Sequence, residues 1–141
     1  MSVMKSYLGD LDGALADYEA ALKREPDNAI ILNNRAGIRH DKKDYQGALA
    51  DYDRAIALNP NWAAAWCNRG VTRRVMGDLK GAVADYDRAI QLKPDFALAY
   101  ANRARAKKEQ GRMAEAEKDY EQSMRLMANG GATSVGLLKQ D

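Results

Sequence analysis

The sequence predicts an all-α protein, a solenoid of antiparallel helix pairs built on 34-residue repeats. Three observations predict it. Proline recurs every 34 residues, and tyrosine, alanine and aspartate keep the same interval. Each repeat also contains two segments in which apolar residues recur every three or four positions, which is one face of a helix. The recurring columns are Pro26, Pro60 and Pro94; Tyr18, Tyr52, Tyr86 and Tyr120; Ala14, Ala48, Ala82 and Ala116; and Asp17, Asp51, Asp85 and Asp119.

Each repeat is predicted to hold a first and a second helix. The first helices are expected at 29–42, 63–76 and 97–110, and the second helices at 10–24, 44–58, 78–92 and 112–126. Asp44 and Asp78 are suited to cap second helices at their N-termini, and Asn61 or Asp95 can cap the first helix that follows. Gly70 lies one turn after Trp66, so we expect a neighbouring backbone to approach Gly70 and the Trp66 ring to fill the gap beside it.

The two ends of the array are irregular. The chain begins partway through a first helix, so residues 1–8 are predicted to form a stub before a separate helix starts at Asp10. The predicted array spans 1–128, as a partial repeat 1–28 and repeats 29–62, 63–96 and 97–128. Residues 129–141 are predicted to be a flexible tail. Apolar residues at both ends lack a full neighbouring helix, which favours self-association through an end of the array.

The second helices share a spaced signature, seen as Ala48, Tyr52, Ala55 and Pro60 and again as Ala82, Tyr86, Ala89 and Pro94. This signature and the 34-residue period resemble the tetratricopeptide repeat family, from the start of the chain to about Leu126. The resemblance implies a right-handed superhelix in which first helices line a concave groove and second helices form the convex back. First helices depart from the family pattern by carrying cations where it has Leu or an aromatic residue: Arg35, Arg69 and Arg103, then Arg39, Arg73 and Lys107.

Charge is divided between the two kinds of helix. The first helices hold ten Lys or Arg against two Asp or Glu, a net charge of +8, and the second helices hold eight against fourteen, a net charge of −6. On the family's geometry this gives a basic groove, which favours an acidic ligand. The alternative is structural, because the cation columns and the Asp column flank the core face of their helices. We expect ion pairs between helices, with Arg69 meeting Asp51 or Asp85.

A smaller set of first-helix residues faces away from the second helices and forms the predicted peptide-binding site. The Asn column can bind an extended peptide backbone, because an amide both donates and accepts hydrogen bonds; a local hydrogen bond within the fold is the equal alternative. Arg74, Arg105 and Lys108 form the positive end of the groove. Co-chaperone domains of the tetratricopeptide family hold a peptide's C-terminal acid with a two-carboxylate clamp of Lys, Asn and Arg side chains. Of the clamp residues, this sequence matches only the Asn. The predicted site is Asn34, Asn68, Asn102, Cys67, Val71, Arg74, Arg105 and Lys108.

No convergent set of acid, base and nucleophile points to catalysis. His40 has no second soft ligand at metal-binding spacing, and Cys67 has no histidine near it in sequence, so no catalytic residue, metal or cofactor is predicted. The net charge of +2 does not favour nucleic acid or a membrane as a partner, and no apolar run is long enough to span a bilayer. We therefore expect a cytoplasmic, non-enzymatic module that binds an extended, acidic peptide of a protein partner. The alternative is a self-assembling scaffold unit that stacks through its ends.

Overall fold

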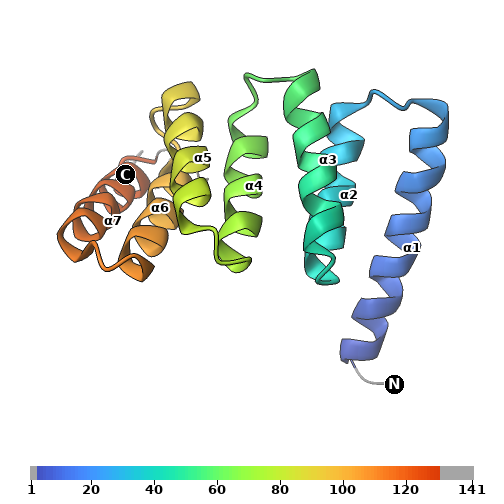
Figure 1. The fold of residues 1–141 in the computed structure, drawn as a ribbon, viewed down its shortest axis with the longest axis horizontal. Coiled ribbons are helices and arrows are strands. Elements are labelled where there is room, and N and C mark those ends of the chain that lie inside the picture. The colour runs from blue at the N-terminus through green and yellow to red at the C-terminus, as the bar shows by residue number, and fades with distance from the viewer. Residues whose placement is uncertain (1–2, 131–141) are drawn as a thin grey trace. The chain divides into compact units, whose positions relative to one another are not determined.

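The computed structural model describes residues 3–130, with side chains from Asp10 onward. This part of the chain is all helix and turn, with seven α-helices in sequence. They fall into two compact units, residues 1–61 and 62–141, each of which is treated by itself below. Sequential helices pack as antiparallel pairs, which confirms the predicted fold class (Figure 1). No described helix combines the length and the apolar character needed to cross a membrane.

The first unit contains α1 (Val3–Arg24), α2 (Ala29–Asp41) and α3 (Tyr45–Leu58). Helix α2 packs against both α1 and α3, so it lies at the centre of this unit. Its apolar residues Leu32 and Ala36 have no exposed surface. Leu32 packs with α1 and α3, and Ala36 packs with Ala48 and Tyr52 of α3.

Helix α1 is one continuous helix, so the predicted break at Gly9–Asp10 is wrong. In the complete repeats, each turn between the helices of a pair contains a residue with positive φ, namely Lys43 (68°), Gly77 (91°) and Gly111 (83°). Each of those turns joins two full helices that bury apolar surface against each other. At Gly9 and Asp10 the backbone is helical and contains no such turn. Continuing the helix instead keeps its backbone N–H and C=O groups hydrogen-bonded.

The second unit contains α4 (Ala63–Val75), α5 (Leu79–Leu92), α6 (Ala97–Glu109) and α7 (Met113–Ala128). Each helix packs against the next, and α4 also contacts α6. Tyr86 of α5 is the largest fully buried side chain and joins a core of small residues from the inner faces of α4, α5 and α6: Ala63, Cys67, Ala82, Ala89, Ala99 and Ala106. The predicted columns of tyrosine and alanine are therefore buried in this unit at Ala82, Tyr86 and Ala116, but not at Tyr120, which is 39% exposed.

The ring that fills the space at Gly70 belongs to Tyr86, not to Trp66 as the sequence suggested. A Cβ atom placed on Gly70 would lie 2.6 Å from Cε1 of Tyr86, closer than real contacts allow. Trp66 is half-buried at the edge of the same core. One of its ring faces is occupied by the guanidinium of Arg69, 4.9 Å from the ring centroid. The close approach therefore occurs between α4 and α5.

The helix caps are partly as predicted. The side chains of Asp44 and Asp78 accept hydrogen bonds from the amides of Gly47 and Gly81, at 3.0 and 2.9 Å, which confirms both N-caps. Asn61 and Asp95 are not caps, because α4 and α6 start one residue later, after Trp62 and Phe96. Neither aromatic side chain can accept a cap hydrogen bond. In the first unit, the same register position is Asn28, which accepts from the amide of Ile31.

Candidate functional site

Three arginines of the first helices bind buried aspartates of the second helices. Arg69 forms a two-point contact with Asp85, from Nε to Oδ2 at 3.0 Å and from Nη2 to Oδ1 at 2.8 Å. Arg35 with Asp51, and Arg103 with Asp119, repeat this geometry at 2.7–2.8 Å. The predicted ion-pair ladder is therefore confirmed, and these arginines are anchored in the fold.

A second cation binds each of the same aspartates from one turn further along the first helix. Arg39 contacts Asp51, Arg73 contacts Asp85, and Lys107 contacts Asp119, each at 3.1 Å. The aspartates are 1–6% exposed. Burial opposes the charge of Asp119, but hydrogen bonds from Arg103 and Lys107 outweigh burial and hold the pKa of that carboxyl below its usual range.

The turn geometry explains which aspartate each arginine meets. Each arginine precedes its aspartate by 16 residues, and the positive-φ residue of the turn, Lys43, Gly77 or Gly111, lies at the midpoint. In an antiparallel pair, residues equidistant from the turn lie at the same height. Arg69 therefore faces Asp85 of its own pair. The sequence left Asp51 open as a partner, although this symmetry about the turn was already present in it.

With the ladder assigned, the other predicted site residues of the second unit define what we call the α4/α6 face. It consists of Asn68, Val71 and Arg74 on α4 and Asn102, Arg105 and Lys108 on α6. The first three and Asn102 are half-buried, whereas Arg105 and Lys108 are exposed. Asn34, the remaining Asn of the predicted column, is exposed on α2 in the first unit. Seven of the eight predicted residues thus lie on α4 and α6, namely the six of this face and Cys67.

Cys67 lies beneath this face and is only 2% exposed, so it offers almost no surface to a ligand. The amide nitrogen Nδ2 of Asn102 donates to its Sγ across 3.5 Å, which joins α6 to α4. Burial raises the pKa of the Cys67 thiol to about 11, with the Asn102 contact opposing the rise. The thiol is therefore protonated at neutral pH and unsuited to act as a nucleophile.

Arg74 and Arg105 of the α4/α6 face contact one carboxylate, that of Glu109, which is not among the predicted site residues. Nη1 of Arg74 lies 3.1 Å from Oε2 of Glu109, and Nε of Arg105 lies 3.7 Å from the same oxygen. The side chain of Arg74 is 15% exposed and that of Glu109 is 40% exposed. Lys108 adds a third, exposed positive charge. The face is therefore basic overall, with one acid in its centre.

The Tyr86 hydroxyl is buried next to this cluster. Among the described residues, it is the one fully buried side-chain polar atom that makes no hydrogen bond. Burial raises the pKa of the Tyr86 phenol well above its ordinary value, whereas the positive charge of nearby Arg74 opposes the rise. Arg74 therefore lies near the buried Tyr86 hydroxyl while it donates a hydrogen bond to Glu109.

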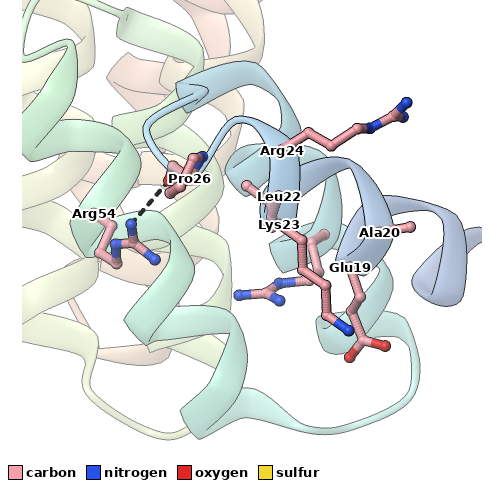
Figure 2. A pocket seen from close by; sticks show the side chains of 8 residues that line it. Glu19, Ala20, Leu22, Lys23, Arg24, Pro26 and Arg54 are labelled. Carbon is pink, nitrogen blue, oxygen red and sulfur yellow. Dashed lines mark hydrogen bonds between the residues drawn. The ribbon is translucent and has the colours of Figure 1, made fainter.

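The hollows formed by the described residues were not predicted, and two of them are lined by several charged side chains. One, of about 730 Å³, lies in the first unit between α1, the loop after it and α3. Figure 2 shows Arg54 of α3 donating a hydrogen bond to the carbonyl of Pro26, while Arg24 points away. The other, of about 510 Å³, lies in the second unit between α6 and α7 and is lined by Arg105, Lys108, Glu109, Met113 and Tyr120. It adjoins the α4/α6 face through Glu109.

The described residues contain no group of three or more His, Cys, Asp and Glu side chains placed to hold a metal ion. His40 lies edge-on to the ring of Tyr45, with 5.2 Å between their centroids.

Tetratricopeptide repeat models match residues 5–63, 63–96 and 97–128. No curated protein matches. Among solved structures, a crystal structure of MamA is 24% identical with a TM-score of 0.61, covering 92% of this chain and 97% of that one. MamA from Desulfovibrio magneticus RS-1 is 18% identical with a TM-score of 0.79, covering 88% and 70%.

A third similar structure is the first TPR of Spaghetti (RPAP3), bound to the HSP90 peptide SRMEEVD. It is 24% identical with a TM-score of 0.69, covering 72% of this chain and 80% of that one. At these identities the solved structures establish the fold that is shared, and the family models establish the family.

Proposed function

The chain belongs to the tetratricopeptide repeat family and is a protein–protein interaction module, and we propose that it binds an extended, acidic peptide at the α4/α6 face. Members of this family are typically non-enzymatic scaffolds. The observation that carries the proposal is the position of Arg74, Arg105 and Lys108, three cations that the ion-pair ladder does not use.

The electrostatics of the face support an acidic ligand. The ladder carboxylates are buried and each contacts two cations, so they repel an approaching anion little. On the α4/α6 face, the positive charges of Arg74, Arg105 and Lys108 exceed the one negative charge of Glu109. The face is therefore positive and attracts anions. Asn68 and Asn102 lie on the same face and can both donate to and accept from a peptide backbone.

Charge reversal tests this proposal. The double substitution Arg74→Glu and Lys108→Glu is expected to weaken binding of a fluorescein-labelled hexaglutamate peptide by roughly tenfold or more and to flatten its salt dependence. Fluorescence anisotropy across a salt series measures both effects. Lys118→Glu with Arg125→Glu changes the net charge equally at exposed positions of α7 and is the matched control. Equal affinity of the wild-type chain for hexaglutamate and hexalysine would count against an acidic ligand.

A second candidate function, self-assembly through an end of the array, is favoured by one observation. Helix α7 exposes four apolar side chains, Met113, Tyr120, Met124 and Met127, at 39–63% of their surface. In the preceding repeat the equivalent of Tyr120 is Tyr86, which is fully buried. The apolar tail residues Val135, Leu137 and Leu138 lie outside the described residues.

Light scattering distinguishes the two candidates. If α7 mediates assembly, the mass of the full chain is expected to rise with concentration, because contiguous exposed apolar surface favours association. Met124→Lys, at the most exposed of these positions, is expected to remove that rise. A full chain that remains monomeric, and that dimerises only when it is shortened to end at Asn129, would show that the tail covers α7.

A further inference from the structure

We propose that Glu109 occupies, in the unliganded chain, the position that a ligand carboxylate takes when a peptide binds. The subsite is formed by Arg74 of α4 and Arg105 of α6, and its ligand is an acidic side chain or a terminal carboxylate. This inference rests on the proposed peptide-binding function. It goes beyond that function by assigning to Glu109 a role in limiting the affinity for an acidic peptide and in setting the specificity of the site.

The contacts of Glu109 differ from those of the ladder aspartates. Each ladder aspartate is almost fully buried and binds its arginine through both carboxylate oxygens. Glu109 is 40% exposed, and both of its arginine contacts are made to a single oxygen, Oε2. Exposed, single-point ion pairs contribute about 0–1 kcal/mol. An incoming carboxylate can therefore displace Glu109, whereas it cannot displace Asp85.

Glu109 is also poorly placed with respect to the helix dipole. It is the last residue of α6, where backbone carbonyls concentrate partial negative charge and a carboxylate is disfavoured. Arg74 lies in the last turn of α4, where a cation is favoured. The helix dipole therefore favours Arg74 at its position and disfavours Glu109 at its own. A ligand carboxylate bound by Arg74 and Arg105 is not part of α6 and avoids this unfavourable position at the end of the helix.

A ligand can reach Glu109 from the side of α7. The hollow of about 510 Å³ is lined by Arg105, Lys108 and Glu109 on α6 and by Met113 and Tyr120 on α7. Met113 is 57% exposed and Tyr120 is 39% exposed, so the hollow has an apolar wall beside its cations. An acidic residue next to an apolar one in a peptide matches this arrangement.

The alternative role for Glu109 is a structural link between α4 and α6. The two roles predict opposite effects on binding. If Glu109 is a structural link, removing its charge should lower both the stability of the chain and its affinity for the peptide. If Glu109 competes with the ligand, its neutralisation should leave the fold intact and raise affinity for anions.

The test compares the full-length wild-type chain with Glu109→Gln and with Glu117→Gln. Glu117 is an exposed residue of α7 outside the α4/α6 face, so its substitution changes the net charge by the same amount. Anisotropy with labelled hexaglutamate is expected to show roughly five- to tenfold tighter binding by Glu109→Gln and less than about a twofold change for Glu117→Gln. Hexalysine binding should not tighten, and thermal unfolding should be unchanged.

A second variant guards against a loss of fold. Glu109→Asp keeps the charge but withdraws the carboxylate from Arg74, and its affinity is expected to lie between those of the wild-type chain and Glu109→Gln. If hexaglutamate binds the wild-type chain and both Glu109 variants bind it equally or more weakly, the inference is wrong and the proposed function stands. If no variant, the wild-type chain included, binds hexaglutamate, the proposed function fails and the inference with it.

Discussion

Replacing Asp85 with alanine is expected to lower the free energy of unfolding by about 3–5 kcal/mol, because it leaves two guanidinium groups facing each other in a largely buried site. Asp85 is 1% exposed and bonds Arg69 through both oxygens and Arg73 at 3.1 Å. The side chains of Arg69 and Arg73 are 13% and 28% exposed, so water can compensate only in part. Urea denaturation measures the change.

The repeat provides a matched control at Asp17. It occupies the same column, but it is exposed, and the two positions that carry a cation in each of the other repeats are Met1 and Lys5 here. Asp17→Ala is expected to cost less than about 1 kcal/mol. A triple variant, Arg69→Met and Arg73→Met with Asp85→Leu, is expected to recover much of the loss, because apolar residues of similar volume can replace a buried ion-pair triad. Similar losses for Asp85→Ala and Asp17→Ala would contradict the structural role given to the ladder.

Replacing Gly70 with valine is expected to destabilise the protein by about 1–3 kcal/mol through overpacking. The added Cβ would lie 2.6 Å from the Tyr86 ring, which is fully buried and enclosed by the core of the second unit. The ring can move only if α4 and α5 separate. Chemical denaturation, with near-UV circular dichroism to follow the aromatic packing, measures both consequences.

Gly13 provides the control for this substitution. It also lies within a helix, but a Cβ there meets nothing within 4 Å. Gly13→Val is expected to change stability by less than about 0.5 kcal/mol, since only helix propensity differs. If both valine variants lose the same stability, the effect comes from valine in a helix and not from contact with Tyr86.

The repeat period determined most of this fold from the sequence alone. Columns of alanine, tyrosine and proline at 34-residue intervals fix the number of helix pairs and the buried face of each second helix. The Asp44 and Asp78 caps followed from local chemistry, because an aspartate before a helix can bond only its own first amides. The Arg and Asp columns predicted an ion-pair ladder for the same reason: charges beside an apolar seam need partners.

The features that depend on contacts between helices were decided only by the tertiary structure. Periodicity could not show that α1 runs through Gly9, because a turn forms only where the returning helix has enough surface to bury. It could not assign the ring over Gly70 to Tyr86, since that contact joins two helices. Glu109 is one exposed acid among many in the sequence, and its importance arises from two arginines, one 35 residues away, that fold onto the same oxygen. Local patterns determine elements and buried faces, whereas long-range contacts determine which surface charges share a site.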